Sequence, residues 1–218
     1  MSDGFPLPKA LIERARQFTG PPVTPRVAAT VMLLRTGPDG LEVYLLRRAA
    51  TMAFASGMYA FPGGSVDPQD ATGLSTVDMS DRLGLAPDEA RAVVRAALRE
   101  VAEEAGLALP AEALIPWARW VTPEFEARRY DTYFFVAVMP PGQEASNISG
   151  EADHAMWIRP AEALDRLAAR EIGMLPPTLV TLRELAKLST VDELVEVAAA
   201  RDPATPVMPR VVDGRLVL

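Results

Sequence analysis

The stretch that decides the fold is Arg99-Glu100-Val101-Ala102-Glu103-Glu104-Ala105-Gly106-Leu107. Its three glutamates occupy helical positions i, i+3 and i+4, so at about 100° per residue they fall within one arc of the helix. Apolar residues cluster on nearly the opposite side of the same helix, at Val94, Leu98, Val101 and Ala105. We therefore expect a helix that buries this apolar stripe and presents three carboxylates together.

Two of these glutamates form an unfavourable pair. Glu100 and Glu104 stand at i and i+4, a spacing at which like charges repel each other on a helix. A positive partner is therefore expected between them. The chain contains no cysteine and a single histidine, so the available ligands are carboxylate oxygens, which favour a hard cation, Mg²⁺ or Mn²⁺.

A second motif, Phe61-Pro62-Gly63-Gly64, lies upstream. Together with the glutamate stretch it resembles the Nudix box, G-x5-E-x7-R-E-U-x-E-E-x-G-U, in which U is an apolar residue. Counting six residues on from Gly64 gives Asp70, where the family has Glu. An insertion of residues 71 to about 91 then interrupts the box. This interrupted box is similar to the branch that includes the coenzyme A diphosphatases of the Nudix-19 type.

Composition and charge narrow the class of protein. The 218 residues contain no apolar run long enough to span a membrane, and the N-terminus lacks the features of a signal peptide. We therefore expect no membrane partner and a cytoplasmic location. A formal net charge of −7 argues against duplex nucleic acid as a partner. It would also repel a polyphosphate substrate unless metal ions and arginines offset the charge.

Hydrophobic patterning predicts strands on both sides of the glutamate helix. Apolar runs at 27–35 and 41–48 flank Pro38-Asp39-Gly40, a strong hairpin signal. Other elements are expected as strands at 57–61, 117–121, 132–139 and 156–158, helices at 8–18, 161–169, 177–187 and 191–200, and a hairpin at 207–218. This order predicts an α/β fold with a mixed sheet and flanking helices. It matches the α/β/α sandwich that the Nudix resemblance implies for about residues 25–169.

The resemblance implies one domain over residues 1–218, with three additions to the common fold. These additions are an N-terminal helical extension at about 1–24, the insertion at about 71–91 and C-terminal helices at about 161–200. Because the insertion leaves into the glutamate helix, we expect it to lie beside the catalytic cleft. There it would form a wall or lid over the substrate, or part of a homodimer contact.

The resemblance also implies a metal-binding set. Glu100, Glu103 and Glu104 would hold the metal ions, and a backbone carbonyl of Gly63 or Gly64 would add a ligand. Paired glycines suit this role because no Cβ keeps the backbone from a ligand. One of Glu103 or Glu104 could instead be the general base that deprotonates water, and the sequence leaves that choice open.

Two further residues are expected close to the glutamates. Arg99 is better placed to hold them by bidentate pairing than to touch the substrate. Family members take a fourth acid from a later loop, about six residues before a tryptophan, which points to Glu151 ahead of Trp157. The single histidine, His154, follows closely. It is either a hydrogen-bonded structural residue, the more common case, or a base near the substrate.

Two arginine pairs are candidates for contact with substrate phosphates. Arg47 and Arg48 end a predicted strand, and Arg128 and Arg129 precede another. Exposed arginines are ordinary surface residues in most proteins, so this prediction rests on their position relative to the motifs.

The expected function is a metal-dependent hydrolase that splits the diphosphate of a nucleoside diphosphate-X compound. Coenzyme A or an acyl-CoA is the first candidate substrate. ADP-ribose, a dinucleotide such as NADH, and a nucleoside triphosphate are the alternatives. The same fold could also serve as a non-catalytic nucleotide-binding module. A third alternative is an acidic scaffold protein that lacks a small-molecule site.

Overall fold

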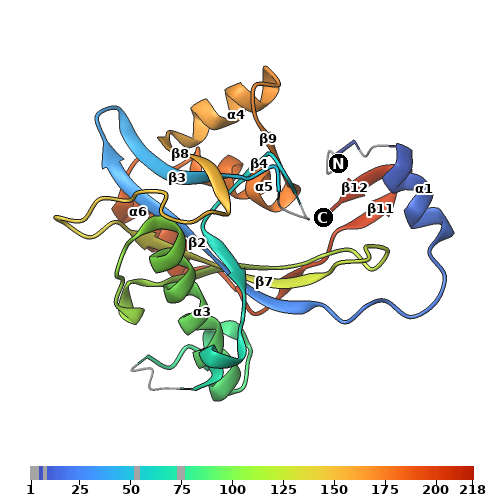
Figure 1. Cartoon of the computed structure of the whole chain (residues 1–218), viewed down its shortest axis with the longest axis horizontal. Coiled ribbons are helices and arrows are strands. Elements are labelled where there is room, and N and C mark those ends of the chain that lie inside the picture. Colours follow the sequence, from blue (N-terminus) through green and yellow to red (C-terminus); the bar gives the residue numbers. More distant parts are fainter. Residues whose placement is uncertain (1–4, 7–8, 52–54, 73–76) are drawn as a thin grey trace.

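A mixed sheet forms the centre of the computed structural model, which describes residues 5–6, 9–51, 55–72 and 77–218 (Figure 1). Its strands follow the order β10-β6-β7-β2-β3-β4-β9, with β5 paired to β2 and β8 paired to β3. The bounds of these strands are β2 Arg26–Gly37, β3 Gly40–Arg48, β4 Met58–Ala60, β5 Gly63–Ser65, β6 Ile115–Val121, β7 Tyr130–Val138, β8 Ala152–Ile158, β9 Gly173–Met174 and β10 Pro206–Val207.

The predicted hairpin at Pro38-Asp39-Gly40 joins β2 to β3, and these two strands then separate. They pair over Leu34–Gly37 and Gly40–Val43. Beyond that point β2 pairs with β5, whereas β3 pairs with β4 on one edge and β8 on the other. The paired glycines of the Phe61-Pro62-Gly63-Gly64 motif begin a short strand, because Gly63 and Gly64 pair with Thr30 and Ala29 of β2. This separation opens the sheet beside the glutamate helix.

Helices cover both faces of the sheet, which confirms the predicted α/β/α sandwich. The longest helix, α3 (Pro87–Ala105), packs on one face, where Val31 and Phe135 belong to the same apolar cluster as its buried side chains. The opposite face is covered by α4 (Pro160–Ala168), α5 (Pro176–Leu185) and α6 (Val191–Ala199). The run expected to be a doubly covered strand is β7, which lies between β6 and β2.

The sequence explains where α3 begins and ends. Pro87 occupies the first helical turn, and the Glu89 side chain accepts a hydrogen bond from the Ala86 amide at 3.3 Å. The helix ends at Gly106, whose φ of 68° suits a residue without a Cβ. The predicted apolar stripe faces the sheet, but Glu104 is also buried, with 7% of its surface exposed. The three glutamates of α3 therefore differ in exposure, because the Glu103 side chain is 56% exposed.

The described part of the insertion contributes to the core. Its described part contains α2 (Ser80–Leu83), and both Met79 and Leu83 are buried in the apolar cluster beneath α3. Arg82 donates a hydrogen bond to the Ala198 carbonyl at 3.0 Å, which ties the insertion to the end of α6. The last residues expected in the insertion form the first turn of α3. Gly73 and Leu74, also expected in this segment, lie outside the described residues.

The two ends of the chain meet in a second, three-stranded sheet of order β1-β12-β11. We use the name terminal module for this sheet and its helix, namely β1 (Phe5–Pro6), α1 (Lys9–Gln17), β11 (Arg210–Val212) and β12 (Arg215–Val217). The structure confirms the predicted C-terminal hairpin as β11 and β12. Figure 1 shows α1 beside these strands, away from α3.

Two short 3-10 helices complete the fold, at Pro68–Ala71 (η1) and Ala111–Ala113 (η2). Among the described residues, no helix combines the length and the apolar character needed to cross a bilayer.

Candidate active site

A cleft opens where β2 and β3 separate, with a cavity volume of about 500 Å³. We call it the cleft from here on. One end is polar and is lined by Arg48, Arg99, Glu100, Glu103 and Glu151. The other end is lined by aromatic and apolar side chains and by the first turn of α5, at Tyr59, Phe61, Phe134, Leu175, Pro177 and Thr178. The cleft therefore offers charge at one end and apolar surface at the other, the usual combination in a small-molecule site.

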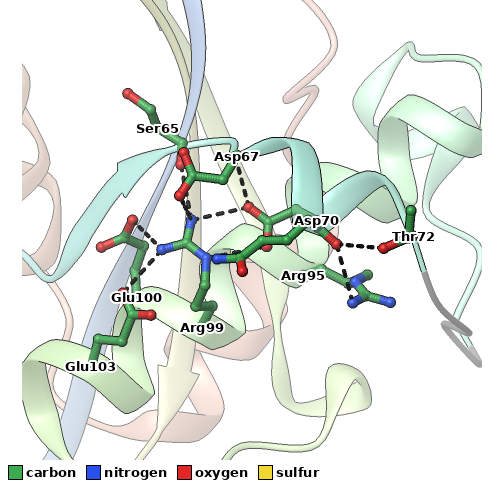
Figure 2. A network of polar contacts seen from close by, with 9 residues as sticks. Ser65, Asp67, Asp70, Thr72, Arg95, Arg99, Glu100 and Glu103 are labelled. Carbon is green, nitrogen blue, oxygen red and sulfur yellow. Dashed lines mark hydrogen bonds and ion pairs between the residues drawn. The ribbon is translucent and has the colours of Figure 1, made fainter.

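Arg99 is the centre of the polar end, and its strongest contact is with Asp70 (Figure 2). Arg99 Nε donates to Asp70 Oδ1 at 3.1 Å and Arg99 Nη2 donates to Asp70 Oδ2 at 3.0 Å. Asp70 is 3% exposed and also accepts a hydrogen bond from the Asp67 amide at 2.8 Å. A forked pair of this kind fixes both position and orientation of the guanidinium. Asp70 thus reaches Arg99 although the insertion lies between them in the sequence.

The opposite edge of the same guanidinium contacts two glutamates of α3 (Figure 2). Arg99 Nη1 donates to Glu100 Oε1 at 2.8 Å and to Glu103 Oε2 at 3.0 Å. Arg99 Nη2 also donates to the Ser65 carbonyl of β5 at 3.0 Å. The pKa of Arg99 is raised, chiefly by its hydrogen bonds with Asp70, so it stays charged. Arg99 thus links α3 to β5 and η1.

Glu104 lies beneath the surface of the cleft and is held by the backbone of β5. Its Oε2 atom accepts a hydrogen bond from the Gly63 amide at 2.8 Å. Burial raises the pKa of Glu104 to about 7, and the negative charges of Glu100 and Glu151 add to this effect. The Gly63 hydrogen bond and the nearby Arg48 oppose it. The pKa of Glu100 is also raised, again chiefly by burial.

The glycine pair is required by close packing. A Cβ at Gly64 would collide with the carboxylate of Glu100, and a Cβ at Gly63 would collide with the backbone of Ala29 and Thr30. A side chain at either position would therefore displace α3 or β2 from β5. The two glycines bring α3 and the sheet together at the polar end of the cleft.

The loop before β8 adds the fourth predicted acid to the polar end. Glu151 lines the cleft, and its negative charge raises the pKa of both Glu100 and Glu104. The Glu151 carbonyl accepts a hydrogen bond from the Ala49 amide at 2.8 Å, which holds this loop against the end of β3. The structure therefore brings together Arg48, Arg99 and the four predicted glutamates.

These carboxylates have the chemistry of a site for a hard divalent cation. All the donors are oxygen atoms, and burial, together with neighbouring carboxylates, raises the pKa of both Glu100 and Glu104 in spite of the nearby Arg99 and Arg48. Within the described ranges no three acidic or histidine side chains already form a metal-binding group. The exposed side chains of Glu103 and Glu151 can adopt other rotamers, so the residues fit a metal ion although the group is not yet assembled.

Three of the four predicted substrate-binding arginines lie elsewhere. Arg129 is buried and donates to the Thr122 carbonyl at 3.0 Å and the Val23 carbonyl at 2.8 Å. Arg47 pairs with Asp153 at 2.6 Å, on the face of β3 opposite to Arg48. Arg128 is exposed and is not among the described residues that line the cleft. Of the four predicted arginines, only Arg48 is among the described residues that line the cleft.

His154 is a hydrogen-bond partner of a cleft residue. Its Nδ1 lies 3.2 Å from the hydroxyl of Tyr59, which lines the cleft from β4. The rings of the two residues meet edge to face. This contact agrees with the structural interpretation of His154, because its ring supports Tyr59 from outside the described lining of the cleft.

Sequence reasoning left the role of Asp70 open and missed the apolar end of the cleft. Its position six residues after Gly64 was the available signal for Asp70, because the Nudix box has an acid there. No comparable signal marks Phe134 or Thr178. These residues reach the cleft only because the fold brings β7 and the start of α5 to it.

The comparisons with known proteins agree with this geometry. The model of the NUDIX domain family matches residues 24–177. The crystal structure of a NUDIX hydrolase from Alicyclobacillus acidocaldarius is 28% identical, with a TM-score of 0.67, and covers 80% of this chain and 96% of that chain. The NUDIX domain of Shewanella oneidensis NrtR, complexed with ADP ribose, shares the fold at 15% identity and a TM-score of 0.53. That match covers 83% of this chain and 97% of that one.

Curated relatives include diphosphatases. Acyl-coenzyme A diphosphatase NUDT19 of Gallus gallus is 25% identical to this chain over 76% of its length. Putative nudix hydrolase 7 of Caenorhabditis elegans is 24% identical over the same share. The chain spans 66% and 62% of these two relatives. Nudix hydrolases generally use divalent metals, in line with the carboxylate cluster on α3. The chain therefore belongs to the Nudix family.

Proposed function

We propose that this protein hydrolyses the diphosphate bond of a nucleoside diphosphate-X compound, and that coenzyme A or an acyl-CoA is its substrate. One observation carries the proposal. Four carboxylates and two guanidinium groups line or underlie one end of a cleft whose other end is apolar. The relatives named as acyl-coenzyme A diphosphatases support this choice of substrate.

Each group at the polar end has a separate task in this proposal. Glu100, Glu104 and Glu151 would hold Mg²⁺ or Mn²⁺, which when bound offsets phosphate charge and lowers the pKa of a coordinated water. Arg99 acts as a positioning residue, because its hydrogen bonds are taken by Asp70, Ser65, Glu100 and Glu103.

Solvent exposure of the side chain separates the two candidate general bases, Glu103 and Glu104. Glu103 has a side chain that is 56% exposed and lines the cleft, so it can reach a water molecule beside the substrate. Glu104 is buried and already accepts the Gly63 amide. We therefore assign proton acceptance to Glu103 and metal holding to Glu104. Arg48 is the arginine placed to meet a phosphate of the substrate.

A substrate panel with product identification tests the proposed activity. Coenzyme A should yield 3′,5′-ADP and a phosphopantetheine. AMP with ribose phosphate, released from ADP-ribose, would instead favour the alternative substrate, and parallel assays should include NADH and a nucleoside triphosphate. Binding of these compounds without turnover would indicate the non-catalytic module. If calorimetry detects binding of none of these compounds and of no divalent ion, the result would indicate a scaffold protein.

Single substitutions test the assignment of catalysis to α3. Glu103→Gln and Glu104→Gln should each lower kcat by roughly 100-fold or more, because each removes a charge from the metal and proton-transfer groups. Glu196→Gln, on the exposed face of α6, is the matched control and should retain wild-type kcat. Wild-type turnover by both α3 variants at saturating metal would reject the assignment.

A further inference from the structure

A second cavity, of about 370 Å³, lies between the terminal module and the β6–β7 connection. Its volume is within the range of ligand sites in proteins. One wall comes from the end of α1 and the residues that follow it, and another from the segment that enters β11. Both of these walls lie outside residues 24–177, the part of the chain that matches the Nudix family. The cavity is therefore an addition of this chain to the common fold.

The wall of this second cavity is mainly apolar. Phe18, Val121, Phe125, Met208 and Val211 contribute the apolar surface, and the charged residues that also line the cavity are Arg16, Glu124, Arg129 and Arg210. Aromatic and branched side chains offer surface to an uncharged ligand, and the unbranched methionine can adjust to ligands of different length. The apolar part of this wall suits a hydrocarbon chain.

Specific contacts hold these walls together. Arg14 Nη1 on α1 donates to Glu126 Oε2 in the β6–β7 connection at 2.8 Å. The buried guanidinium of Arg129 donates to the Val23 carbonyl at 2.8 Å, which joins the same connection to the chain leading from α1. Phe5 pairs with Leu216, so β1 is fixed to the C-terminal hairpin. The elements that line the second cavity are thus tied to one another.

The second cavity and the cleft meet at Thr122, which lines both. Thr122 Oγ1 accepts a hydrogen bond from the Tyr130 amide at 3.0 Å, and Tyr130 also lines the cleft. A ligand that occupies both the polar end of the cleft and this cavity must therefore pass Thr122. Such a ligand is elongated and has a charged end and an apolar end.

We propose that the second cavity binds the acyl chain of an acyl-CoA while its diphosphate lies at the polar end of the cleft. This inference rests on the proposed function and adds a site that selects among acyl-CoA compounds by chain length. Burial of successive methylene groups in an apolar wall favours binding, so longer chains should bind more tightly until the cavity is full.

The test compares coenzyme A with butyryl-, octanoyl- and dodecanoyl-CoA as substrates. In the wild-type protein, KM should fall by roughly tenfold from coenzyme A to dodecanoyl-CoA, because methylene groups are buried. Ala15→Trp fills the second cavity from α1 and should bring the ratio of these two KM values to about one. Ala10→Trp places the same side chain on an exposed part of α1 and should keep the wild-type ratio.

Met208→Trp fills the cavity from the opposite wall and replaces Ala15→Trp if that variant does not fold. A KM that is independent of chain length in the wild-type protein would overturn the inference. So would a wild-type ratio of KM values in both filled variants. If neither variant folds, wild-type protein irradiated with a diazirine-bearing dodecanoyl-CoA decides. Labelling of residues 121–125 or 208–211 supports the site, and labelling confined to other segments rejects it.

A binding measurement separates this inference from the proposed activity. Dodecanoyl-pantetheine lacks the diphosphate and cannot be a substrate of the proposed reaction. Calorimetric binding to the wild-type protein that is lost in Ala15→Trp would support the apolar site even if no acyl-CoA is hydrolysed. Hydrolysis of coenzyme A without binding of this probe would leave the proposed activity standing and overturn the second site.

Discussion

The two halves of α3 are held in place by opposite kinds of interaction. Toward its start, the helix buries apolar side chains against Met79 and Leu83 of the insertion and against the sheet. Toward its end, Arg99 binds the buried carboxylate of Asp70 and two glutamates that line the cleft. The insertion thus adds to the core at one half of the helix and leaves the charged half intact. This is why a box interrupted in sequence remains continuous in space.

The largest expected effect comes from breaking the charged half. Arg99→Met leaves Asp70 buried without its partner and should lower the free energy of unfolding by about 3–5 kcal/mol. The loss of contacts to Glu100 and Glu103 should also lower kcat by roughly 10- to 100-fold. Urea unfolding and steady-state kinetics measure the two effects.

Arg99→Lys is the matched control for charge, because an ammonium group cannot form the forked contact with Asp70. It should recover part of the stability and little of the kcat. If Arg99→Met had the same free energy of unfolding as the wild-type protein, the role assigned to the Arg99–Asp70 pair would be contradicted.

Leu83→Ala, in the insertion, tests the packing against the apolar half of α3. Leu83 is 1% exposed, so its truncation should lower the free energy of unfolding by about 2–5 kcal/mol. Because no described residue of 77–91 lines the cleft, KM should stay at the wild-type value. Ser80→Ala on the same helix is the control. A changed KM with unchanged stability would restore the idea that the insertion forms a wall of the site.

Asp70→Asn tests the link between the two segments with a smaller change. Asn keeps the shape of Asp, and Arg99 retains its contacts with Glu100 and Glu103. The free energy of unfolding should therefore fall by about 1–3 kcal/mol, with a moderate fall in kcat. Asp67→Asn is the control, because Asp67 is half-exposed and lies 3.9 Å from Arg99. Equal effects of the two substitutions would show that Asp70 has no special part.

The local sequence pattern predicted most of the elements that form the two halves of α3 and their surroundings. The period of apolar residues located α3, and the Pro-Asp-Gly turn located the β2–β3 hairpin. Three of the four glutamates followed from the motif, and Glu151 followed from its distance to Trp157. These signals lie within a few residues of one another, so the sequence alone can express them.

Features that depend on distant contacts escaped prediction. The burial of Glu104 depends on β5, whose place follows from the separation of β2 and β3. The pairing of β1 with β12 joins the two ends of the chain, and a strand of two residues has no periodicity to detect. The same is true of Arg129, which resembles a surface arginine in sequence but donates hydrogen bonds to the carbonyl of Thr122 and to that of the distant Val23.

The smallest expected effect concerns pH and the charged half. Because burial raises the pKa of Glu104 to about 7, the folded protein retains a proton there that the unfolded chain loses above its ordinary pKa of 4.5. Without metal, Glu104 therefore lowers the free energy of unfolding progressively as pH rises from about 4.5 to 7. Above that range its effect is constant. A divalent cation takes the place of the proton and removes the cost. The rise in Tm caused by Mg²⁺ should then be a few degrees larger at pH 8 than at pH 5.5. Glu104→Gln should show less of this difference, and an equal rise at both pH values in the wild-type protein would contradict metal binding at Glu104.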